Sequence, residues 1–139
     1  MLGAQGALIG TRFCASAEAL VHPRAKQRIV QAHGGQTGRT RVFDIVRGYA
    51  WPAPYTGRAL RNDFLQQWHG GEQMLGEQLG PARAAYAVAA HDADFDTALV
   101  WAGEAAGLIH GIESASTLVA QISAQAQEQL HRAAQTLQR

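Results

Sequence analysis

Apolar residues recur most regularly near the end of the chain. Leu118, Ile122, Ala126, Leu130, Ala133 and Leu137 follow one another at steps of three or four residues, so they share one face of a predicted helix. Shorter helices are predicted upstream, where apolar residues are grouped between glycines and prolines: residues 23–32, 58–68, 72–79 and 81–90. The pattern therefore predicts a mainly helical chain.

Two apolar runs predict strands instead. Residues 6–13 are mostly apolar and are followed by helix formers, which is typical of a strand buried on both faces in a parallel sheet. Residues 41–46 have the β-branched and aromatic content of a second strand. Just after the first run, we expect Ser16 to cap a short helical turn with Glu18 near its start.

Two further segments have weaker patterns. Residues 48–57 contain three aromatic side chains and two prolines, which predict an extended loop anchored by its aromatic residues. This loop is expected to pack its aromatic side chains, in preference to serving as a polyproline ligand. Residues 96–102 fit a helix and a strand equally well.

Composition narrows the class of protein. The 139 residues fit one domain and are too few for a complete (β/α)₈ barrel. Because 27 of them are alanine, the expected core is modest and rich in small side chains. The chain lacks an apolar run long enough to span a membrane, and its single cysteine, Cys14, is typical of a reducing, cytoplasmic compartment.

The charges argue against nucleic acid as a partner. The net charge is only +1, which provides little attraction for a polyanion. Five arginines nevertheless occur among aromatic residues: Arg39, Arg41, Arg47, Arg58 and Arg61. Ion pairs with carboxylates and stacking on aromatic rings within the protein explain them better than a nucleic-acid surface does.

A calcium loop is suggested by one acidic cluster and then excluded. Asp92, Asp94 and Asp96 have the first three spacings of such a loop, but Thr97 and Gly103 stand where it needs glycine and glutamate. A solvated turn is the better interpretation, and we expect no metal site in the chain.

The candidate chemistry lies at Gly10 and Thr11. At the end of a predicted strand, a glycine allows a ligand to approach the backbone, and the Thr11 hydroxyl lies beside its own N–H. Backbone donors in such a place form a phosphate-binding loop. The alternative is that Gly10 only allows a strand and a helix to pack tightly.

The same segment resembles a known family. Leu2-Gly3-Ala4, the Gly-Thr-Arg-Phe of residues 10–13 and Glu18 resemble the last-strand motif of the FMN-dependent nitronate monooxygenases, also called 2-nitropropane dioxygenase-like enzymes. The likeness continues over nearly the whole chain, in residues 22–28, 40–44, 51–55, 58–62 and 101–109. It implies a TIM barrel that binds FMN at the C-terminal ends of its strands and oxidises alkyl nitronates with O₂.

The resemblance also implies roles for particular residues. Gly10 and Thr11 correspond to contacts of the family with the FMN phosphate. The family's catalytic histidine and its other flavin contacts precede this motif, so we assign no catalytic residue. Residues 102–104 either border the active site or simply cap a helix and pack tightly, and the second interpretation is favoured.

We therefore predict a C-terminal fragment of an α/β TIM barrel, comprising the last strand and the helices that follow, mostly helical in isolation with one or two short strands. Residues 1–33 are expected to form the last βα unit with its FMN-phosphate loop, and residues 34–139 a mainly helical extension packed on the barrel. The expected function is the C-terminal part of a flavin-dependent nitronate oxidoreductase, inactive as an isolated chain. FMN and a small nitronate are the expected ligands of the full-length enzyme, and the isolated chain is expected to bind FMN weakly or not at all. The alternative is a noncatalytic helical module, derived from such an enzyme, that self-associates as a homo-oligomer.

Overall fold

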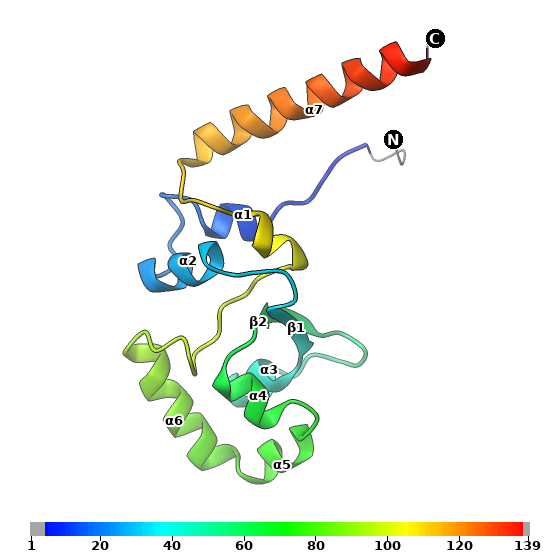
Figure 1. The fold of residues 1–139 in the computed structure, drawn as a ribbon. Coiled ribbons are helices and arrows are strands. Elements are labelled where there is room, and N and C mark those ends of the chain that lie inside the picture. The colour runs from blue at the N-terminus through cyan, green and yellow to red at the C-terminus, as the bar shows by residue number, and fades with distance from the viewer. Residues whose placement is uncertain (1–4, 138–139) are drawn as a thin grey trace.

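The computed structural model of the protein describes residues 5–137, and it is mainly helical, as predicted. A two-stranded sheet lies near the middle of the molecule, with helices on either side of it and one long helix extending away (Figure 1). In chain order the elements are α1 (Thr11–Cys14), α2 (Pro23–Val30), β1 (Thr37–Thr40), α3 (Val42–Arg47), β2 (Gly57–Leu60), α4 (Asp63–Trp68), α5 (Glu72–Glu77), α6 (Leu79–His91), the 3₁₀ helix η1 (Glu104–Leu108) and α7 (Ala115–Leu137). Among residues 5–137, no helix combines the length and apolar character that a membrane crossing requires.

Strands β1 and β2 form an antiparallel pair. Thr37 lies opposite Leu60, and Thr40 lies opposite Gly57. The segment that fitted helix and strand equally, residues 96–102, includes an extended stretch that runs beside β2. The Leu60 N–H donates to the Val100 carbonyl at 2.9 Å, and the Ala102 N–H donates to the Arg58 carbonyl at 3.1 Å. This extended segment holds Trp101 beside the hairpin.

Residues 41–46 are not the predicted strand, because they form helix α3. The Val42 N–H donates to Thr40 Oγ1 at 2.9 Å, which satisfies a backbone donor at the start of the helix. Val42, Phe43 and Val46 are buried on one helical face, and burial outweighs the local strand preference of such residues. Gly48, with φ at +81°, ends the helix in the left-handed conformation that favours glycine.

The predicted helix over residues 58–68 is also wrong in its first half. Gly57–Leu60 is strand β2, and the helix begins only at Asp63. Asn62 sets this boundary, because its Oδ1 accepts the Leu65 N–H at 2.9 Å and thereby caps α4. Phe64, Leu65 and Trp68 are buried on one side of α4 as predicted.

The predicted strand over residues 6–13 does not form within the described part of the chain. Residues 6–10 are exposed and have no regular structure, and residues 11–14 form the short helix α1. A strand needs a neighbouring strand to satisfy its backbone groups, and β1 and β2 are paired elsewhere. Ser16 does not cap a helical turn either, since it is buried in a bridge to Glu113.

The remaining helices agree with the pattern to within a few residues. Helix α2 covers most of residues 23–32, and α5 and α6 cover most of 72–79 and 81–90. Helix α7 matches the predicted terminal helix, but of its expected apolar face Leu118 is buried and Leu130 is half exposed. The side chain of Leu137 lies outside the described residues.

Two small cores hold the helices against the hairpin. The first lies between α2, η1 and the extended segment and includes Ile29, Val100 and Ile109. The second lies between α3, α4, α5 and α6 and includes Phe43, Leu65 and Leu75. Leu60 of β2 belongs to the first core and Ala59 to the second, so the hairpin joins the two.

Candidate functional site

Gly10 lies at the start of α1 with open space beside it. The Phe13 and Cys14 N–H groups both donate to the Gly10 carbonyl at 3.0 Å, which forms the first turn. A Cβ built on Gly10 meets no described atom within 4 Å. Tight packing between a strand and a helix therefore does not account for this glycine in the described part of the chain.

Thr11 connects this turn to a distant segment. Its Oγ1 accepts the Gly103 N–H at 2.8 Å, across a sequence separation of 92 residues. On the other side of Gly103, Glu104 begins η1 and pairs with Arg58 at 2.8 Å. The 3₁₀ helix therefore begins at the last of residues 102–104, and Gly103 also contacts Thr11, the predicted cofactor contact.

Arg12 is occupied by contacts within the protein. Its guanidinium donates to the Gly111 carbonyl at 2.9 Å and to the Glu113 carboxylate at 2.6 Å. Nearby, Glu18 Oε2 accepts the Ala115 N–H at 2.8 Å and so caps α7. Arg12 and Glu18 thus hold the Gly10–Thr11 turn against the residues that precede α7.

The residues at this turn fit a phosphate group. Because Thr11 Oγ1 accepts a hydrogen bond from Gly103, the Thr11 hydroxyl proton is available to donate to a phosphate oxygen. The turn's own hydrogen bonds do not use the Thr11 and Arg12 amides, which are the donors that a phosphate accepts. The open space at Gly10 leaves room for the group.

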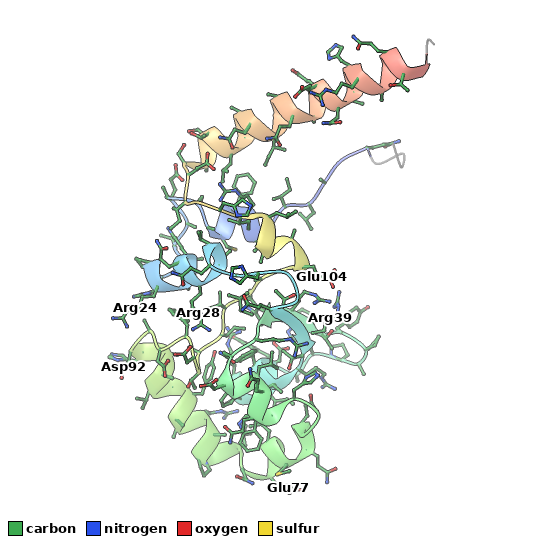
Figure 2. All side chains as sticks on the ribbon, viewed as in Figure 1. Arg24, Arg28, Arg39, Glu77, Asp92 and Glu104 are labelled. Atoms are coloured by element: carbon green, nitrogen blue, oxygen red, sulfur yellow. The ribbon has the colours of Figure 1, made fainter. Side chains whose placement is uncertain are left out.

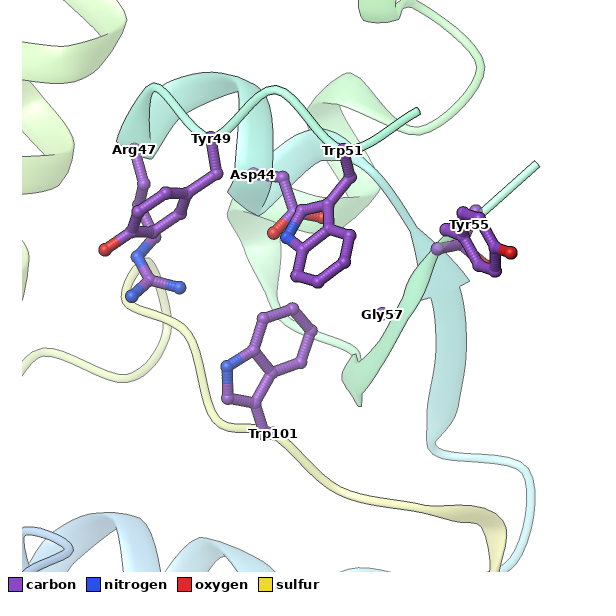
Figure 3. Close-up of a pocket in the computed structure, with 8 residues that line it drawn as sticks. Asp44, Arg47, Tyr49, Trp51, Tyr55, Gly57 and Trp101 are labelled. Carbon is purple, nitrogen blue, oxygen red and sulfur yellow. The ribbon is translucent and has the colours of Figure 1, made fainter. Parts of the chain in front are cut away.

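A pocket of about 600 Å³ adjoins the same region and was not predicted from the sequence. Trp101, two residues before Gly103, forms one wall, and Trp51 extends toward it from the opposite side (Figure 3). The lining consists of Asp44, Arg47, Tyr49, Trp51, Tyr55, Thr56, Gly57 and Trp101. The loop over residues 48–57 does not pack its aromatic side chains, since Tyr49, Trp51 and Tyr55 are all more than half exposed around this opening.

Asp44 is a buried charged residue in the lining of this pocket, with only 5% of its surface exposed. Burial raises the pKa of the Asp44 carboxyl above its ordinary value, while the positive charges of Arg47 and Arg41 act in the opposite direction. An acid within the otherwise apolar run Val42-Phe-Asp-Ile-Val46 is the sequence signal that could have pointed to this site.

Two of the five arginines that the sequence singled out, Arg47 and Arg58, form the expected aromatic contact and ion pair. The Arg47 guanidinium carbon lies 4.7 Å from the centroid of the Tyr49 ring, and Arg58 pairs with Glu104. Arg28 of α2 pairs with Asp96, and Figure 2 shows Arg28 on the side of α2 that faces the Asp92 end of α6. The Asp94 carboxylate accepts the Asp96 N–H at 3.0 Å, so the acidic cluster forms a turn.

Solved structures of FabK share this fold. FabK from Thermotoga maritima matches with a TM-score of 0.68 and 27% identity, over 88% of this chain and 37% of that chain. Its M276A mutant matches with a TM-score of 0.63 and 25% identity, over 94% of this chain and 36% of that chain. FabK belongs to the TIM-barrel family, so the fold is that of the C-terminal part of a TIM-barrel enzyme, as predicted.

Sequence relatives identify the family. Residues 1–125 match the sequence model of the nitronate monooxygenase family, so the chain belongs to that family. Nitronate monooxygenase npaC of Metarhizium robertsii is 29% identical over 133 residues, which are 90% of this chain and 36% of that protein. Nitronate monooxygenase of Neurospora crassa is 27% identical over 132 residues, which are 93% of this chain and 34% of that protein.

The match covers only part of each relative. The chain spans about a third of the length of these two curated proteins. The family and FabK are flavin enzymes in general. The resemblance read from the Gly-Thr-Arg-Phe motif and the segments downstream is thereby confirmed at the level of the family.

Proposed function

We propose that this chain is the C-terminal part of a flavin-dependent oxidoreductase that oxidises alkyl nitronates with O₂. The observation that carries the proposal is the match of residues 1–125 to the nitronate monooxygenase family. In this proposal the chain contributes cofactor contacts and no catalytic residue, and it is inactive without the rest of such an enzyme. A cytoplasmic location, favoured by the single Cys14, belongs to the same proposal.

Gly10 and Thr11 are the proposed contacts to the FMN phosphate. The Thr11 hydroxyl donates to a phosphate oxygen while it accepts the Gly103 N–H, and the absence of a side chain at Gly10 lets the group approach the turn. When bound, FMN supplies the ring that takes up electrons from the nitronate. The chain's own part is to hold the phosphate and so to fix the position of that ring.

The proposed domain boundary follows from this assignment. Residues 1–33 are the last βα unit of the barrel, and residues 34–139 are the extension that packs on it. The exposed residues 6–10 then become a strand when neighbouring barrel strands supply its hydrogen bonds. Such a change satisfies the backbone of that segment and buries Leu8, which is fully exposed here.

A hybrid enzyme tests the proposal. The upstream two thirds of the Neurospora crassa relative is joined to this chain in place of its own matching third, and bound FMN and nitronate-dependent O₂ consumption are measured. We expect a yellow, active protein. A folded hybrid that retains no flavin, or that retains flavin without oxidising nitronates, contradicts the proposal.

Substitutions in the hybrid test the phosphate site itself. Gly10→Val should lower the bound FMN at least tenfold by blocking the approach of the phosphate, while the matched control Gly6→Val, which also enters open space, should not. Thr11→Ser keeps the hydroxyl and should retain FMN, whereas Thr11→Val should lose it. Equal flavin content in all four variants would remove Gly10 and Thr11 from the site.

The noncatalytic, self-associating module remains a second candidate because apolar side chains are exposed. Leu8 and Leu20 are fully exposed, and Leu108 is 78% exposed. Exposed apolar surface of this kind favours association between copies. A hybrid without activity, together with a stable oligomer of the chain alone, would favour this second function.

A further inference from the structure

The aromatic pocket beside β2 is built for a flat ligand. Trp51 and Trp101 extend into it from opposite sides, as Figure 3 shows, and Tyr49 and Tyr55 stand at its edges. Its volume of about 600 Å³ lies within the range of ligand sites, about 300–1,000 Å³. Aromatic side chains that surround an opening bind planar rings by offset stacking or edge-to-face contact.

Gly57 keeps this pocket open on the side of β2. A Cβ at Gly57 would lie 2.2 Å from Cζ3 of Trp101, so any larger residue would displace the indole. Glycine at this position therefore lets the Trp101 ring lie directly against the strand. The arrangement holds a large apolar surface in place, although 39% of Trp101 remains exposed.

Asp44 gives the pocket its polar contact. Asp44 as a residue is only 5% exposed, and its carboxylate makes neither a hydrogen bond nor an ion pair with another described residue. Among the described residues, no fully buried side-chain oxygen lacks a partner, so the Asp44 oxygens are open to the cavity. A carboxylate with so little exposure is stabilised by a donor that a ligand or water supplies. Because Asp44 lines the cavity, the natural partner is an N–H group of a bound molecule.

The charges around Asp44 favour a neutral ligand over a cation. Arg47 stacks on Tyr49 at 4.7 Å, and Arg41 donates to the Trp51 carbonyl at 3.3 Å. Both guanidinium groups are close enough to act on the Asp44 carboxyl. The two guanidinium charges outweigh the single carboxylate charge and so repel a cationic ligand. The Tyr49 ring, where a cation could stack, is already occupied by Arg47.

We propose that this pocket binds a neutral, planar nitrogen heterocycle, whose ring lies between Trp51 and Trp101 and whose N–H donates to Asp44. The site goes beyond the proposed nitronate oxidation and does not require FMN. The same chemistry is offered by a small indole-like molecule and by the base of a nucleoside, so the two sources are separated by experiment.

Titration of the ¹⁵N-labelled chain with indole tests the proposal. The indole N–H signals of Trp51 and Trp101 should shift, whereas that of Trp68, which is buried in the second core, should not. 1-Methylindole has the same ring without the donor, and it should bind about tenfold or more weakly, since a hydrogen bond to a charged group is lost. Equal binding of the two compounds, or no shift at Trp51 and Trp101, overturns the proposal.

Variants locate the contact. In Asp44→Leu the preference for indole over 1-methylindole should disappear, while the control Glu77→Gln, which removes a charge outside the pocket, should preserve it. Trp101→Leu should weaken the binding of indole and of 1-methylindole to the same extent. If Asp44→Leu does not fold, the comparison of the two compounds on the unmodified chain still decides the question.

Two further ligands complete the test. If adenosine binds more tightly than indole and shifts the same Trp51 and Trp101 signals, the ligand is a nucleoside. If adenosine binds more weakly, the ligand is an indole-like small molecule. Tryptamine carries a cation on the same ring. If tryptamine binds tenfold more tightly than indole, the proposal that the ligand is neutral is wrong.

Discussion

Replacing Asn62 by alanine should destabilise the chain strongly and loosen one wall of the pocket. Its Oδ1 accepts the Leu65 N–H at 2.9 Å, and its Nδ2 donates to the Ala98 carbonyl at 2.9 Å and to the Phe95 carbonyl at 3.3 Å. The residue is only 5% exposed. It therefore caps α4 and also ties α4 to the segment that leads to Trp101.

The size of the effect follows from these contacts. Loss of the helix cap costs about 0.5–2 kcal/mol. The Ala98 carbonyl loses its donor inside the protein, and a buried polar group without a partner costs about 1–3 kcal/mol. Together they amount to roughly 1.5–5 kcal/mol, which is a large share of the 5–15 kcal/mol that stabilises an ordinary domain.

Urea unfolding followed by tryptophan fluorescence measures this loss, because Trp68 is buried beside α4. Asn62→Asp is the matched control, since it keeps the capping oxygen and removes the donors to Ala98 and Phe95. Its free energy of unfolding should fall between those of the unmodified chain and Asn62→Ala. A loss below 1 kcal/mol in Asn62→Ala would refute the reasoning.

Three further outcomes are expected. Burial raises the pKa of Asp44 above 3.8, so the folded chain binds this proton more tightly than the unfolded chain, and stability falls as pH rises through that range. Asp44→Asn should therefore be more stable than the unmodified chain at pH 7, with the difference closing below pH 3.8 in thermal unfolding; lower stability at pH 7 contradicts this. Gly107→Ala places a Cβ 3.0 Å from the Gly34 nitrogen and should cost about 1–3 kcal/mol in urea unfolding, whereas Gly111→Ala, in open space, should cost little. Light scattering should give a mass above 14.9 kDa for the purified chain, and Leu130→Gln on the exposed face of α7 should lower it; a monomer before substitution refutes self-association.

Sequence patterns predicted elements whose burial is decided locally. Helix α7 and the helices around residues 72–91 have regular spacing or clear boundaries, and they form where expected. Residues 41–46 were mistaken for a strand because Val and Ile favour strands locally, yet their burial against α5 and α6 selects a helix. Residues 6–13 show the related limit, since a strand depends on a neighbour that its own sequence does not specify.

The candidate sites differ in the same way. Gly10 and Thr11 could be proposed from the sequence because the motif is contiguous, although the contact of Thr11 to Gly103 required the fold. The pocket was missed because α3, the loop over residues 48–57 and Trp101 come together only in the folded chain. A local pattern could indicate that Asp44 was unusual, but not which side chains surround it.

The contacts of Thr11, Arg12 and Glu18 close the chain into a ring. Their hydrogen bonds to Gly103, Gly111, Glu113 and Ala115 span 92 to 101 positions. The intervening segment, which includes the hairpin and α3 to α6, is thus one long loop whose two ends lie side by side. Such a long loop can be lengthened or exchanged at little entropic cost, because each doubling of its length adds only about 0.6 kcal/mol. The fold therefore allows a different pocket to be grafted onto the same Gly10–Thr11 turn. Under the proposed function, such a graft changes ligand preference and leaves cofactor retention unchanged.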